Sequence, residues 1–93
     1  MKVIILYVLG GEKMELLIHN LSLKKAIIIA GEFHIDEKDL LIDSTTLTCD
    51  VLLTEKNNWQ MNCHSQNAIQ IYNNCTGRWV TLSSNEFSRI SIQ

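Results

Sequence analysis

Proline is absent from the chain, and glycine occurs only four times in 93 residues. Proteins made of β-sheets commonly use proline to protect exposed sheet edges, because proline cannot donate to a ladder of hydrogen bonds. If this chain forms sheets, their edges must be protected by closure of the sheet, by lysine and glutamate side chains, or by a second subunit. The scarcity of glycine also excludes a glycine-rich phosphate-binding loop.

Charge of either sign is scarce as well. Eight basic and ten acidic residues give a formal net charge of −2. A nucleic-acid-binding protein needs a basic face that neutralises phosphates, and Lys24-Lys25 is the only adjacent basic pair. We therefore expect no nucleic-acid partner. Because 46% of the residues are hydrophobic, we expect the chain to fold as one small domain over residues 1–93.

No apolar run is long enough to cross a membrane, so we predict no membrane role. The run at residues 3–9 follows Lys2 as in a signal peptide, but no Ala-x-Ala-like site follows it. We expect a buried strand there, closed by Gly10-Gly11 into a second strand at 14–19. Two alternatives stay open. The protein could be exported, or residues 1–13 could be a mis-called extension, because residues 10–13 back-translate to a purine-rich stretch like a bacterial ribosome-binding site.

The three cysteines, Cys49, Cys63 and Cys75, are odd in number and show no CxxC spacing. A full disulfide framework is therefore excluded. We expect free thiols packed in the core of a cytoplasmic protein, because a free cysteine packs as a small hydrophobe. One disulfide plus one free thiol in an exported protein is the alternative.

Turn-forming residues recur about every ten positions, and the stretches between them have the length of short β-strands. The turn signals lie at Gly10-Gly11, Asn20, Gly31, Asp36, Asp43-Ser44, Asn57-Asn58, 65–67, 73–77 and 83–85. Between them, apolar residues alternate with polar ones: Leu47, Cys49, Val51 and Leu53; Trp59, Met61 and Cys63; Ile69 and Ile71; Val80 and Leu82; Ile90 and Ile92. This pattern predicts an all-β domain.

The clearest exception to this alternation is residues 22–30. Leu23, Ala26, Ile27 and Ala30 fall at helical spacing behind a possible Ser22 N-cap, with Gly31 as a stop signal. The β-branched run 27–29 favours a buried strand instead, and we predict the strand. The fold class is then an antiparallel β-sandwich or small barrel of about seven to nine short strands. A short β-solenoid, or an α+β fold with one helix at 22–30, is the alternative.

Motifs that carry chemistry are weak. Cys63-His64 with Cys75, joined by Cys49, His19 or His34, is the best zinc candidate, but adjacent strand residues point to opposite faces. Carboxylate pairs that could serve acid–base catalysis are Glu32 with Asp36 or Glu37, and Asp43 with Asp50. Such pairs on loops are usually solvated. We predict no enzyme, no metal and no cofactor.

Aromatic residues beside amides are the best candidates for contact with a ligand or partner. Trp79 follows Arg78, and Tyr72 precedes Asn73-Asn74. Tryptophan and tyrosine next to asparagine, glutamine and arginine are typical of sugar-stacking sites and of protein hot spots.

The last segment, 87–93, is an apolar strand with Phe87, Ile90 and Ile92 and the single charge Arg89. Such a strand pairs readily with its own copy or with a partner's sheet. We therefore predict a non-catalytic bacterial or phage module that binds another protein or itself, with Trp79 near the contact. A carbohydrate-binding module is the second hypothesis, and a small thiol- or metal-dependent enzyme is the third.

Overall fold

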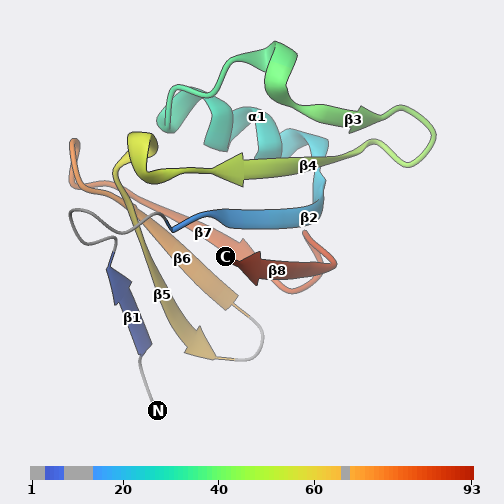
Figure 1. Ribbon diagram of the computed structural model, residues 1–93. Helices are drawn as coiled ribbons and strands as arrows, with labels where there is room; N and C mark the ends of the chain where they lie inside the picture. The colour runs from blue at the N-terminus through green and yellow to red at the C-terminus, as the bar shows by residue number, and fades with distance from the viewer. Residues whose placement is uncertain (1–3, 8–13, 66–67) are drawn as a thin grey trace.

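The computed structural model describes residues 4–7, 14–65 and 68–93 (Figure 1). Within these residues the chain forms eight strands, one α-helix and two 3-10 helices. In chain order they are β1 (Ile4–Tyr7), β2 (Leu16–Ser22), α1 (Leu23–Glu32), η1 (Glu37–Asp39), β3 (Leu41–Asp43), β4 (Thr48–Leu53), η2 (Glu55–Asn57), β5 (Trp59–Ser65), β6 (Ala68–Asn73), β7 (Trp79–Ser83) and β8 (Arg89–Ile92).

The strands form two four-stranded antiparallel sheets, which we call sheet A and sheet B. Sheet A has the order β1-β5-β6-β7, and sheet B has the order β3-β4-β2-β8. The strands of sheet A cross those of sheet B steeply (Figure 1). The prediction of a small antiparallel all-β or α+β domain is confirmed. A β-solenoid is wrong for the described residues, because every strand pair among them is antiparallel, whereas the coils of a solenoid stack in parallel.

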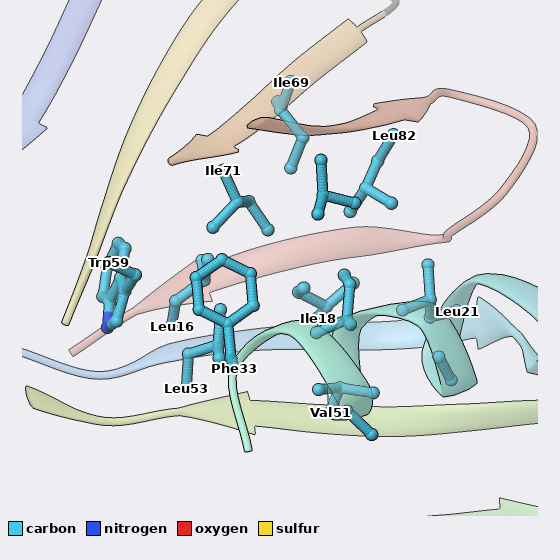
Figure 2. Close-up of a cluster of buried hydrophobic side chains, with 14 of the residues drawn as sticks. Leu16, Ile18, Leu21, Phe33, Val51, Leu53, Trp59, Ile69, Ile71 and Leu82 are labelled. Carbon is cyan, nitrogen blue, oxygen red and sulfur yellow. The ribbon is translucent and has the colours of Figure 1, made fainter. Parts of the chain in front are cut away.

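The alternation of apolar and polar residues builds the core between the sheets. Along β6 and β7 every second side chain is buried, because successive side chains of a strand point to opposite faces. Figure 2 shows how side chains from both sheets and α1 meet. The largest buried residues are Trp59, Phe33, Leu16, Ile18, Leu21, Ile29, Leu53, Met61, Ile71 and Leu82. Burying each such side chain contributes about 1.5–3 kcal/mol.

The strand predicted at 22–30 is wrong, because α1 occupies this segment. Ala26, Ile29 and Ala30 form a buried stripe at helical spacing, whereas Ile27 and Ile28 are 56% and 47% exposed. A strand would place Ile27 and Ile29 on one face and Ile28 on the other, whereas the structure buries only Ile29 of the three. Burial of the helical stripe therefore outweighs the strand preference of a β-branched run.

Both ends of α1 differ from the predicted caps. The Ser22 side chain makes no capping bond. Instead the Leu23 amide donates to the Leu47 carbonyl at 3.0 Å. At the other end the helix continues past Gly31 to Glu32, and the left-handed residue is His34, with φ of 56°. Tertiary contacts at both ends replace the local signals.

The N-terminal prediction holds in part. β1 is a strand, but it pairs with β5 in sheet A, whereas the next strand, β2, belongs to sheet B. The two therefore do not form the expected hairpin. The Gly10-Gly11 turn lies outside the described residues.

Helix α1 lies against β2 and β4 and also runs along β7. Near its start, the Lys25 ammonium donates to the Thr81 carbonyl in β7 at 2.9 Å. At its end, the Glu32 carboxylate accepts from the Arg78 guanidinium at 3.0 Å, just before β7. Side chains near both ends of the helix therefore bond to β7 or to the residue just before it.

Candidate functional site

The edge of sheet B at β8 presents unpaired backbone groups. The amides and carbonyls of Glu15 and Gln93 exchange hydrogen bonds at 3.0 and 3.1 Å. Because bonded and non-bonded pairs alternate along an antiparallel ladder, Ile90 and Ile92 occupy non-bonded positions opposite β2. Their amides and carbonyls therefore point away from the sheet. No other strand of the described part of the chain pairs with β8.

The edge of sheet A at β7 is occupied by side chains. By the same alternation, Thr81 and Ser83 direct backbone groups away from β6. The Thr81 carbonyl accepts from Lys25, and the Ser83 amide donates to the Glu86 carboxylate at 2.9 Å. The Ser83 carbonyl accepts from the Glu86 amide, also at 2.9 Å. Lys25 and Glu86 lie 3.9 Å apart, so the outward groups at Thr81 and Ser83 that are bonded share one pair of opposite charges.

The structure divides the five predicted contact residues into two groups. Phe87 and Ile90 are partly buried and pack against the hydrophobic core of their own chain. Arg78, Tyr72 and Trp79 lie on the other sheet, at the turn between β6 and β7. The strand at 87–93 therefore offers its backbone edge to a partner, more than its apolar side chains.

Tyr72 and Trp79 form a cross-strand aromatic pair on the outer face of sheet A. They occupy opposite positions of β6 and β7, with ring centroids 4.7 Å apart and planes tilted by 51°. Trp79 is 46% exposed, whereas Trp59, on the inner face, is fully buried. The burial of Trp59 agrees with the alternation of apolar and polar residues predicted for this strand. Trp79 is one of the large exposed apolar side chains of the described chain.

Arg78 is held by a cluster at the end of α1. Its Nε lies 3.0 and 3.2 Å from the two oxygens of Glu32, which also accepts from the Thr76 hydroxyl at 2.9 Å. The side-chain amide nitrogen of the buried Asn73 donates to the Glu32 main-chain carbonyl at 3.0 Å. The side-chain oxygen of Asn73 accepts from the backbone amides of Cys75 and Thr76. This cluster fixes the turn before β7.

Hydrogen bonds set the charge state of this cluster. The bond from Arg78 chiefly lowers the pKa of Glu32, and the bonds from Thr76 and Asn73 act in the same direction. Glu32 in turn raises the pKa of Arg78. Glu32 therefore serves as the anionic partner of an ion pair, which is a structural role. It is not paired with Asp36, which caps η1 by accepting from the Lys38 amide.

The other carboxylate pair has a similar outcome. Asp43 accepts from Thr45, and these bonds lower the pKa of Asp43. Asp50 accepts from the Asn20 amide at 2.9 Å. Each carboxylate thus stabilises a local turn or strand junction.

The cysteines occupy different environments. Cys49 is free and buried, and burial raises the pKa of its thiol. Cys75 is free and exposed, so the expectation that all cysteines are packed in the core is wrong for Cys75. The turn at 74–77 places it at the surface, where its sulfur accepts from Asn58 at 3.6 Å. The side chains of Cys63 and His64 lie outside the described part of the structure.

A groove of about 630 Å³ lies at the C-terminal end of α1. Cys75 and His34 both line it, with Glu32, Asp36 and Lys56. No hydrogen bond joins Cys75 to His34 among the described side chains. Within those side chains, no three histidine, cysteine or acidic groups converge as metal ligands. The groove therefore lacks the activating contact that a thiol nucleophile requires.

Sequence reasoning missed Lys25, Glu86 and Asn73. In the sequence, Lys25 stands out only as half of the basic pair Lys24-Lys25, and Asn73 only as part of the turn signal at 73–77. Their roles depend on contacts over 56 and 41 positions of sequence, to Thr81 and Glu32. The cross-strand position of Trp79 was recoverable only in part, from its alternation with Val80 and Leu82.

No protein-family model, no curated protein and no solved structure matches this chain. Among the described residues, no helix is long and apolar enough to cross a membrane.

Proposed function

We propose that the protein is a non-catalytic β module that associates with a second copy of itself through β8. The observation that carries the proposal is the outward direction of the Ile90 and Ile92 backbone groups at the end of sheet B. A strand edge of this kind is a template for pairing with another strand. A two-fold axis is the simplest operator, because it lets the same edge serve both partners.

The register of the pairing follows from which groups point outward. When Ser91 lies on the two-fold axis, Ile90 of one copy is opposite Ile92 of the other, and the outward groups of both copies are paired. Arg89 is then opposite Gln93 of the second copy, so no like charges meet. Ile92, which is 42% exposed, gains a neighbouring Ile90 on the same face. Sheet B thereby becomes a continuous sheet across two subunits.

A cysteine at Ser91 tests this register. Residues on the axis form a non-hydrogen-bonded pair, whose Cβ atoms lie about 4.5–5.5 Å apart, close enough for a disulfide after small adjustment. We expect Ser91→Cys, in a Cys75→Ser background, to form a covalent dimer under mild oxidation. Thr81→Cys, on the covered strand β7, is the matched control and should stay monomeric. Equal cross-linking of both variants would contradict the register.

Proline at Ile92 separates association from folding. The Ile92 amide points to the open edge, and proline is tolerated in a strand where its missing N–H faces outward. Ile92→Pro should therefore leave the monomer folded by circular dichroism and weaken the dimer at least about tenfold. Ser91→Pro removes an amide that bonds to β2, so it should destabilise the monomer itself.

Sedimentation of the unmodified protein decides the proposal. We expect a dimer in the micromolar range, and the fraction of dimer should rise with concentration. A monomer at about 100 µM would overturn it, because a dissociation constant above that concentration corresponds to less than about 5.5 kcal/mol of association free energy.

A further inference from the structure

The outer face of sheet A carries a second surface of different chemistry. Gln60, Tyr72 and Trp79 occupy neighbouring positions on β5, β6 and β7 and form one row across the sheet. The next row contains Gln70 and Thr81, again on neighbouring strands. Aromatic rings and uncharged hydrogen-bonding groups thus lie side by side on three strands.

The Tyr72 ring contacts both the turn at Gly77 and the Trp79 ring. A Cβ atom at Gly77 would lie 3.5 Å from the Tyr72 hydroxyl oxygen, so the end of the tyrosine ring rests on the turn. Gly77 has φ of 76°, a conformation that glycine adopts without strain. The Trp79 ring packs against the tyrosine ring and leaves almost half of its own surface in solvent. The exposed indole is therefore a fixed surface.

The polar neighbours are oriented by bonds to one another. The Gln60 amide donates to the Asn74 carbonyl oxygen at 2.7 Å, and the Gln70 amide donates to the Thr81 hydroxyl at 3.1 Å. A glutamine amide has two donor hydrogens and an acceptor oxygen, so Gln60 keeps hydrogen-bonding capacity beyond this contact. These side chains can pair with a ligand without first being ordered, which lowers the entropic cost of binding.

We propose that this face binds a neutral oligosaccharide, with Trp79 as the stacking surface and Gln60 and Asn74 as hydrogen-bonding groups. A pyranose ring has one face of C–H groups, which packs on an aromatic ring, and a rim of hydroxyls that both donate and accept.

The charge of the surface favours a neutral ligand. The described outward side chains of β5, β6 and β7 include no acidic or basic group, and the neighbouring Arg78 is paired with Glu32. A phosphorylated or acidic ligand would therefore meet no counter-charge. A protein partner is less well matched, because the buried core of a protein interface is more apolar than the rest of the surface, and the neighbours of this ring pair are amides and hydroxyls. The exposed leucines Leu41 and Leu52 lie instead on sheet B.

The test uses purified protein and neutral oligosaccharides of three to six units: linear glucans, mannans, galactans and N-acetylglucosamine oligomers. Binding is measured by calorimetry and by protection of Trp79 fluorescence from acrylamide. We expect at least one of these sugars to bind with a dissociation constant below about 1 mM. Trp79→Ala should weaken this binding at least tenfold, and Gln60→Ala several-fold. Trp79→Phe should retain part of it.

Leu52→Ala, on the outer face of the other sheet, is the matched control and should bind as the unmodified protein does. Circular dichroism of Trp79→Ala should be unchanged, because the side chain is exposed. Absence of binding to every sugar at about 10 mM would overturn the proposal. Binding that Trp79→Ala leaves intact would overturn it as well, as would a peptide ligand that requires Trp79 when no sugar binds. Ile92→Pro should not alter sugar binding, so this test is independent of dimerisation.

Discussion

β7 and β8 follow one another in the chain, and each lies at the edge of its sheet. The two edges differ in whether their outward backbone groups have hydrogen-bond partners. Three outward groups of β7, the Thr81 carbonyl and the Ser83 amide and carbonyl, are bonded to Lys25 and Glu86. The outward groups of β8 at Ile90 and Ile92 have no such partner among the described residues. The two remaining edges, β1 and β3, are four and three residues long, and β8 has four residues as well. A chain without proline can therefore protect an edge by side-chain capping, and β8 is the edge at the C-terminal end of the chain that we expect to pair.

The largest effect should follow from loss of the turn that leads into β7. Asn73 is 3% exposed, and its side-chain nitrogen and oxygen form hydrogen bonds with the backbone of Glu32, Cys75 and Thr76. Asn73→Ala leaves several of these backbone groups without partners, so we expect the free energy of unfolding to fall by about 2–3 kcal/mol. Urea denaturation measures the change. Asn74→Ala, at an exposed neighbour, should cost less than about 0.5 kcal/mol, and equal losses for the two variants would contradict this role.

Removal of the cap on β7 should have a smaller effect. Lys25→Met keeps most of the aliphatic length but loses the hydrogen bond to Thr81 and the contact with Glu86. We expect a loss of about 1 kcal/mol in the free energy of unfolding. Amide exchange in β7 should also become faster, whereas β8 stays unchanged. Lys24→Met, at an exposed position, is the control, and faster exchange in that variant would argue against a specific cap.

Acid should loosen the same edge through its carboxylates. Bonds from the Ser83 amide and hydroxyl lower the pKa of Glu86, and Arg78 lowers that of Glu32. A carboxylate whose pKa is lower in the folded state stabilises the fold above its ordinary pKa, and this stability is lost as the pH falls through the folded pKa. We therefore expect the urea midpoint to decrease between about pH 6 and pH 3. Glu86→Gln with Glu32→Gln should flatten the decrease, and an unchanged slope would exclude both groups as its source.

The smallest effect concerns the turn after β3. Leu47 has φ of 54° and is 63% exposed, and its carbonyl accepts from the Leu23 amide at the start of α1. Asparagine tolerates this left-handed conformation better than leucine does. Leu47→Asn should therefore raise the free energy of unfolding by about 0.5 kcal/mol. Leu41→Asn, an equally exposed leucine in regular β3, should give no gain.

Local patterns predicted most of the strands, because apolar and polar residues alternate in segments such as 69–71 and 80–82. They did not predict α1, because the choice between helix and strand at 22–30 depended on which side chains pack against the sheets, and the buried ones are Ala26, Ile29 and Ala30. The candidate surfaces, too, were predictable where local sequence determines them and unpredictable where distant contacts do. The exposed Trp79 and the apolar end strand were visible as sequence features. The cap by Lys25 and the anchor at Asn73 depend on contacts between distant segments, for which a single sequence carries no signal.

The pairing of β2 with β8 also has a consequence for the order of folding. β5, β6 and β7 are joined by short connections and can form a meander early, because closing a short loop costs little entropy. Residues 16–19 meet residues 89–92 only when nearly the whole chain has been gathered, and such distant contacts form late. The strand that we expect to join two subunits is thus completed at the end of folding. Dimerisation would then act as a checkpoint, since only a chain that has finished folding presents the edge that another copy recognises.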